Sequence, residues 1–195
     1  MLSSYNLQPQ NRKYRNTENF RQTDKAKRIS SLKKSEDCPC NKNLVVDDNL
    51  FNIMSIKMLL KKTKNLPKGI DMASDGHKGL QMMEKKLQTC CREPYQLIIV
   101  DLNMPNLDGI GMLQEIHNRY EKQEFLSYKQ NASLFIMATC QSDDDLKHNY
   151  KHYGFHYYMQ KPIGFHDLQA IANTEFEDHS DGTRNESLIQ EIMVS

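Results

Sequence analysis

A chain of 195 residues, of which 38% are hydrophobic, has room for one ordinary domain and for polar extensions. The formal net charge of +1 gives no reason to expect attraction of the whole chain to nucleic acid or to a membrane surface. The sequence has no secretory signal and no apolar run near the ~18–20 residues that cross a bilayer, so we expect a cytoplasmic protein without a membrane segment.

The polar residues are concentrated at the two ends. Residues 1–40 are rich in Asn, Gln, Ser, Lys and Arg with little apolar periodicity, and residues 174–195 are mostly acidic or polar. Such segments bury too little apolar surface to offset the entropy of ordering. The composition therefore predicts a basic N-terminal arm that is disordered alone, a domain over residues 41–173, and an acidic C-terminal tail.

The first half of the expected domain alternates strands with helices. A short apolar run, 44–46, suits a buried strand that ends in Asp47 and Asp48, and Asn49 can cap a helix that ends at about residue 62. A weaker strand, 70–73, precedes a turn at 74–76 and a helix that ends at about residue 88.

The second half begins with the strongest strand pattern of the chain. Residues 95–101 form a continuous apolar run of the kind found in parallel sheets that are covered on both faces, and the run ends at Asp101. A loop to Gly109, an amphipathic helix and a long polar connection over 120–133 follow. We then expect a strand at 134–139, a polar helix that stops at Gly154, a strand at 155–160 and a short last helix from about Phe165.

Five alternations of strand and helix predict an α/β fold, a doubly wound parallel sheet of five strands with helices on both faces. In such sheets, functional groups gather at the carboxyl ends of the strands. These ends carry five candidate residues: Asp47, Asp48, Asp101, Thr139 and Lys161.

Carboxylates that converge at one edge repel one another unless a cation lies among them, and an all-oxygen site of this kind suits Mg²⁺. A carboxylate can also attack phosphorus and form an aspartyl phosphate. The phosphoryl oxygens then need a metal ion, a lysine and a hydroxyl donor close by. The predicted strand ends supply the lysine, the hydroxyl donor and the carboxylates that would bind the metal ion.

With these residues in place, the chain resembles the response-regulator receiver family from about Leu44 to Ile171. The resemblance is carried by five segments in order, each at a predicted strand end: Val45-Val46-Asp47-Asp48-Asn49, Ala73-Ser74-Asp75-Gly76, Ile99 to Gly109, Met137-Ala138-Thr139 and Tyr158-Met159-Gln160-Lys161-Pro162. It implies a flavodoxin-like receiver fold.

The resemblance also implies roles for individual residues. Asp101 would be phosphorylated; Asp48, Asp101 and the main-chain carbonyl of Asn103 would bind Mg²⁺, and Asp47 would hold the water shell of the metal. The remaining roles fall on three residues: Thr139 would donate to a phosphoryl oxygen, Lys161 would pair with Asp101 or the phosphate, and Tyr158 would be the switch aromatic. The Lys161-Pro162 bond resembles one that is cis in the family.

Each of these residues also has a structural reading. Asp47 and Asp48 suit a loop start or a helix cap, and Asp101 suits a solvated strand end. Thr139 is an ordinary strand residue, Lys161 can be a surface lysine, and Tyr158 can simply pack on the sheet. Two other clusters are weak: Cys38, Cys40, Cys90 and Cys91 lack zinc spacing, and His148, His152 and His156 are interrupted by Gly154. We expect reduced thiols and solvated histidines at these positions.

We expect a phosphoacceptor in a histidine-to-aspartate relay, with a histidine kinase or phosphotransfer protein as the phosphohistidine donor. The acidic residues after the expected domain suggest no DNA-binding module, so output should occur by protein contact. A scaffold role through the basic arm is the alternative. A magnesium hydrolase is less favoured, because Asn103 lies where such enzymes place a second acid, and we expect no catalysis on external substrates.

Three features depart from the family pattern. Tyr153 replaces a usually small residue before Gly154, the connection over 120–133 is long, and the last helix is expected to be short and weakly apolar. The last feature puts the usual docking face of the family in doubt.

Overall fold

The computed structural model describes residues 40–67, 69–88, 93–122, 124–125, 133–142 and 144–176. The predictions made for the basic arm and the acidic tail fall almost entirely outside these residues. The same is true of Cys38, Cys90 and Cys91, while Cys140 is an exposed free thiol. None of the described helices is both long enough and apolar enough to cross a membrane.

The centre of the molecule is a sheet of five parallel strands in the order β2-β1-β3-β4-β5. The strands run over Asn43–Val46 (β1), Ile70–Ala73 (β2), Leu97–Asp101 (β3), Leu134–Thr139 (β4) and Tyr157–Gln160 (β5). The chain reverses its direction of winding after β2, which makes the sheet doubly wound. The predicted fold class is therefore confirmed.

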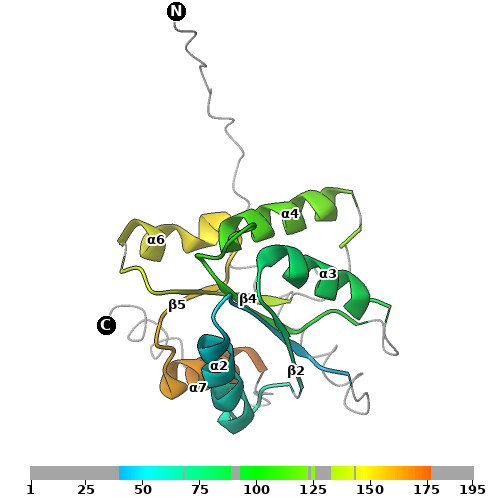
Figure 1. Ribbon diagram of the computed structural model, residues 1–195. Helices are drawn as coiled ribbons and strands as arrows, with labels where there is room; N and C mark the ends of the chain where they lie inside the picture. Colours follow the sequence, from blue (N-terminus) through cyan, green and yellow to red (C-terminus); the bar gives the residue numbers. More distant parts are fainter. Residues whose placement is uncertain are drawn as a thin grey trace, which may run out of the picture.

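Helices cover both faces of this sheet (Figure 1). On one face lie α2 (Leu50–Lys62) and α7 (Phe165–Phe176), and on the other lie α3 (Gly76–Lys86), α4 (Gly109–Glu121) and α6 (Asp144–Asn149). Asn49 caps α2 as expected, because its side chain accepts a hydrogen bond from the amide of Phe51.

The apolar strand residues divide between two cores, one on each face. Successive side chains of a strand point to opposite faces, so Val46 belongs to the core under α3 and α4, and Val45 to the core under α2 and α7. All five residues of β3 are buried. Truncating such a residue, as in Ile99→Ala, would cost about 2–5 kcal/mol of stability. The cores thereby hold the strand ends in fixed positions.

Two expectations about the last third of the chain need correction. The last helix is not short, because α7 has 12 residues and buries Leu168, Ile171, Ala172 and Phe176, a complete apolar stripe at helical spacing. The strand expected at 155–160 begins only at Tyr157.

The residues around Gly154 behave as the sequence suggests. The helix before it tightens into a 3₁₀ turn over Tyr150–Tyr153, and Gly154 ends it at φ 93°, in the left-handed region. The ring of Tyr153 is 36% exposed. The Lys161-Pro162 peptide bond is cis, as the resemblance implies.

Candidate functional site: an acidic cluster at the carboxyl edge of the sheet

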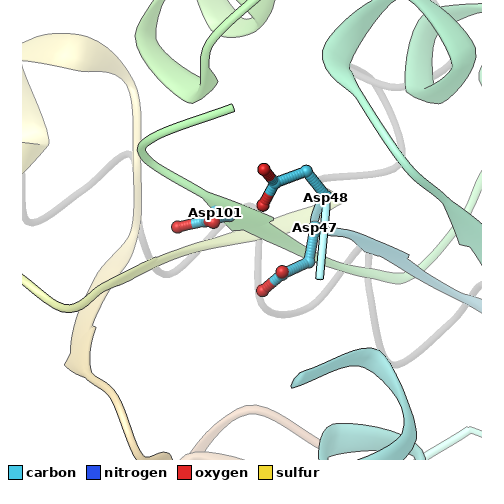
Figure 2. A group of neighbouring side chains, drawn as sticks. All are labelled: Asp47, Asp48 and Asp101. Carbon is cyan, nitrogen blue, oxygen red and sulfur yellow. The ribbon is translucent and has the colours of Figure 1, made fainter. Parts of the chain in front are cut away.

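Three carboxylates meet where β1 and β3 end. β1 and β3 are neighbours, with Val46 beside Val100, so the residues that follow β1 lie next to Asp101 at the end of β3. One oxygen of each of Asp47, Asp48 and Asp101 lies within 4.8 Å of the others (Figure 2). It is the one such group of three or more potential metal ligands within the described part of the chain, where no histidine cluster forms.

The two adjacent aspartates differ in their surroundings. Asp47 is 1% exposed, and its Oδ1 accepts hydrogen bonds from the Asn49 amide at 2.8 Å and from Asn52 Nδ2 at 3.1 Å. Asp48 is exposed to solvent. Figure 2 shows the two side chains leaving the end of β1 in different directions. Asp48 is thus the carboxylate of this pair that can take a ligand from solution.

Lys161 joins the two buried carboxylates. Its Nζ lies 2.6 Å from Asp47 Oδ2 and 2.8 Å from Asp101 Oδ1, and its side chain is only 7% exposed. The backbone places it there, because the Lys161 amide donates to the Thr139 carbonyl at 2.7 Å beyond the paired ends of β4 and β5. The expected meeting of Asp101 with Lys161 is present.

The charges of this cluster are out of balance. Burial raises the pKa of the Asp101 carboxyl, and the nearby charge of Asp47 adds to this, although Lys161 and the Asn103 amide oppose it. Burial opposes the charge of Lys161, yet its hydrogen bonds to Asp101 and Asp47 raise the pKa of the ammonium overall. With all four groups ionised, three carboxylates and one lysine leave two negative charges for a further cation.

The loop after β3 packs tightly over the end of this strand. A Cβ atom on Gly109 would come within 2.5 Å of the Asp101 carbonyl oxygen, so a side chain there would push α4 away from the site. The Asn103 amide points toward Asp101 Oδ1 at a long 3.4 Å, and the Asn103 side chain is exposed. The Asn103 carbonyl, expected as a metal ligand, belongs to this same loop.

Thr139 and Tyr158 are linked through one residue of the loop after β4. The amide of Gln141 donates to Thr139 Oγ1 at 3.0 Å, and its carbonyl accepts from the Tyr158 hydroxyl at 2.9 Å. Thr139 is fully buried one residue beyond Ala138, the strand partner of Asp101. Tyr158 is half-buried, with its ring tilted against Tyr150. Gln141 therefore connects the Tyr158 hydroxyl to Thr139 at the end of β4.

Comparison with known proteins identifies the family of the chain. The family model described as "Response regulator receiver domain" matches residues 44–173. The chain belongs to this family. It is therefore a receiver domain of two-component signalling.

Individual relatives agree with this assignment. A probable chemotaxis protein CheY from Rhizobium etli is 28% identical over 69% of this chain and 92% of its own length. Hybrid signal transduction histidine kinase F from Dictyostelium discoideum is 36% identical over 47% of this chain and 7% of that kinase. Among solved structures, the receiver domain of Saccharomyces cerevisiae Ssk1, crystallised with the histidine phosphotransfer protein Ypd1, shares the fold. Its TM-score is 0.56 at 23% identity, over 71% of this chain and 90% of that one.

Two residues of the site were missed by sequence reasoning. Asn52 donates to Asp47, and Gln141 connects Thr139 to Tyr158. Asn52 lies at the third position of α2, where its side chain returns toward the end of β1, and this turn of the helix was the available signal. Gln141 acts through its backbone, which no side-chain pattern reveals.

Proposed function

We propose that this receiver domain, spanning residues 41–173, accepts a phosphoryl group on Asp101 from the phosphohistidine of a partner protein. The observation that carries the proposal is the position of Lys161, whose ammonium bonds both Asp101 and Asp47 in an otherwise acidic cluster. A lysine in that position neutralises charge on an incoming phosphoryl group. The reaction would require no turnover of an external substrate.

In the transfer step, a carboxylate oxygen of Asp101 forms a bond to phosphorus while the N–P bond of the phosphohistidine breaks. The electron pair of that bond stays on the imidazole nitrogen, so the donor leaves as histidine. Lys161 would follow the negative charge onto the phosphoryl oxygens. Thr139 uses its oxygen as an acceptor for the Gln141 amide, and its hydroxyl proton would serve a phosphoryl oxygen.

The donor set fits Mg²⁺. All three side-chain ligand candidates are carboxylates, they converge within 4.8 Å, and Asp48 faces solvent, where a partly hydrated ion can enter. Asp48, Asp101 and the carbonyl of Asn103 would hold the ion, with Asp47 supporting its water shell. When bound, Mg²⁺ would neutralise the two excess negative charges and draw the phosphoryl oxygens toward Asp101.

The partner would dock beside this edge of the sheet. α2 begins two residues after Asp48, and its outer side exposes four large apolar residues: Leu50 (65% exposed), Phe51 (85%), Met54 (46%) and Met58 (59%). Apolar side chains gathered at one place are typical of protein interfaces. We propose that a histidine kinase or phosphotransfer protein covers this α2 face, as a donor must approach Asp101 from this side.

The signal would leave through the link between Thr139 and Tyr158. If Thr139 turns toward a phosphoryl group, the Gln141 backbone that bonds both residues moves with it. The Tyr158 hydroxyl then loses or exchanges its acceptor, which couples the new charge to the surface around β5 and α6. A downstream protein would recognise that surface.

The direct test incubates the chain with acetyl phosphate and Mg²⁺ and measures the intact mass. A gain of one phosphoryl group that is labile in base is expected for the parent and not for Asp101→Asn. If the parent gains no mass from acetyl phosphate or from a phosphohistidine protein, the proposal is wrong and the scaffold alternative is favoured. Release of inorganic phosphate from added phosphomonoesters would instead favour a hydrolase.

A further inference from the structure

Asn52 contacts the acidic cluster from outside the set of residues already assigned. It is the third residue of α2 and half-buried, and its Nδ2 donates to Asp47 Oδ1 at 3.1 Å. It does not cap the helix, because Asn49 performs that role through Phe51. Its side-chain contact with Asp47 therefore needs another explanation.

The contact completes the shell of donors around Asp47. The Asn49 amide and Asn52 Nδ2 both donate to Oδ1, and Lys161 Nζ donates to Oδ2. With Oδ1 held from two directions, the carboxylate cannot rotate freely, and Oδ2 stays directed at Lys161. Since the same lysine bonds Asp101, the orientation of Asp47 fixes where the ammonium lies relative to Asp101.

The uncharged side-chain amide of Asn52 suits the task of orienting Asp47. A lysine or arginine at position 52 could donate to Asp47 as well, but it would remove one of the two excess negative charges that attract a divalent cation. An aspartate would repel Asp47 and compete for Lys161. Asparagine orients the carboxylate and leaves the charge of the cluster unchanged.

We infer that Asn52 is a positioning residue of the phosphoacceptor site, which acts through Asp47 to hold Lys161 and to keep the cluster receptive to a divalent cation. The inference rests on the proposed function of Asp101. Partners of this kind commonly change metal affinity or activity by about 10–100-fold when they are removed.

The test compares Asn52→Leu, which has the same branched side-chain skeleton and no donor, with the parent and with Asn173→Leu. Asn173 is an exposed amide on α7 that accepts from Asn65 and Gln169, so the control removes surface hydrogen bonds away from the cluster. Calorimetric titration with Mg²⁺ alone should show at least about tenfold weaker binding for Asn52→Leu. Phosphorylation by acetyl phosphate at saturating Mg²⁺ should slow by a similar factor, and Asn173→Leu should match the parent in both.

A double-mutant cycle with Asp47→Asn separates positioning from general damage. If Asn52 acts through Asp47, Asn52→Leu has little further effect on Mg²⁺ affinity or rate in the Asp47→Asn background. Asn52→Lys keeps a donor but adds a positive charge, and should bind Mg²⁺ more weakly than Asn52→Leu.

The outcomes distinguish this inference from the proposed function. Additive effects in the cycle, or an Asn52→Leu variant that binds Mg²⁺ like the parent, overturn the role of Asn52 while phosphorylation of the parent stands. A parent that neither binds Mg²⁺ nor gains a phosphoryl group overturns the proposed function, and the role of Asn52 fails with it.

Discussion

The parallel strands of the sheet begin at one edge, the amino edge, and end at the other, the carboxyl edge. The two edges carry the same kinds of polar residue in different arrangements. At the amino edge, Lys42 pairs with Glu93 at 3.3 Å, and Asp71 accepts hydrogen bonds from Asn41 and from the Tyr95 hydroxyl, both at 2.6 Å. At the carboxyl edge, Asp47, Asp48 and Asp101 lie together, and Lys161 pairs with Asp47 and Asp101. Both edges are partly buried, so burial alone does not separate them.

The difference lies in the balance of charge. The amino edge also holds Lys86, which is buried and lies 5.5 Å from the centre of the Tyr95 ring, so two lysines accompany the two carboxylates Glu93 and Asp71. The acidic cluster at the carboxyl edge has two more carboxylates than lysines. A balanced, hydrogen-bonded cluster needs no charge from outside, whereas an excess of negative charge favours the binding of a cation. The excess of negative charge, more than the presence of charged residues, distinguishes the acidic cluster as the candidate site.

The largest contrast is expected from the two buried lysines. Lys161→Met removes the cation that faces the incoming phosphoryl group, and phosphorylation by acetyl phosphate should fall at least about 100-fold. Lys42→Met leaves Glu93 unpaired and should cost about 1–3 kcal/mol of stability in urea unfolding, with phosphorylation at the parent rate. Equal losses of phosphorylation in both variants would contradict the division between the edges.

The response to Mg²⁺ should come next. An ion bound only by the folded chain, at about 100 times its dissociation constant, stabilises the fold by about 2.7 kcal/mol. Thermal unfolding with Mg²⁺ or EDTA should show this for the parent and a much smaller shift for Asp48→Asn. Asp71→Asn, the matched change at the amino edge, should keep the full Mg²⁺ response relative to its own baseline. If Asp71→Asn also lost the stabilisation by Mg²⁺, the response would not be specific to the acidic cluster.

A change on the α2 face, next to the carboxyl edge, should have a smaller effect on phosphorylation, and one that depends on the phosphoryl donor. Phe51→Ser removes the most exposed ring of the α2 face and should slow transfer from a phosphohistidine protein by about tenfold, equivalent to about 1.4 kcal/mol of lost interaction. Phosphorylation by acetyl phosphate needs no docking and should be unchanged. A variant slowed with both donors would mean that Phe51 supports the site itself.

The sequence predicts the carboxyl edge far better than the amino edge, for a physical reason. The apolar run at 97–101 has a visible end, and parallel strands bring their carboxyl ends to one edge of the sheet, so the meeting of Asp101 with Lys161, the residue after β5, follows from topology. The different surroundings of Asp47 and Asp48 do not follow from topology, because they depend in part on where Asn52 points after a turn of helix. The contact of Asp71 with Tyr95 has no sequence pattern, because it joins positions 24 residues apart through side chains alone.

The smallest expected effect on the acidic cluster comes from Tyr95 at the amino edge. Tyr95→Phe removes the hydroxyl that donates to Asp71, and the loss of one hydrogen bond to a carboxylate should cost about 1.5–3 kcal/mol in urea unfolding. The carboxyl edge is untouched, so Mg²⁺ binding and phosphorylation should match the parent.

The pH dependence of stability identifies this contact more specifically. Burial, together with the hydrogen bond and charge of Asp71, raises the pKa of the Tyr95 hydroxyl above its usual 10.0. Above pH 10 the unfolded chain releases this proton while the folded chain keeps it, so the unfolded state binds fewer protons and stability falls as pH rises. Because Tyr95→Phe removes this contribution, its stability should decline less steeply than that of the parent between pH 10 and pH 11, measured by urea unfolding at each pH. If the stability of the two proteins declined equally with pH, the Tyr95 hydroxyl would ionise in the folded chain at its usual pKa. The hydrogen bond from this hydroxyl to Asp71 would then be weaker than the geometry indicates.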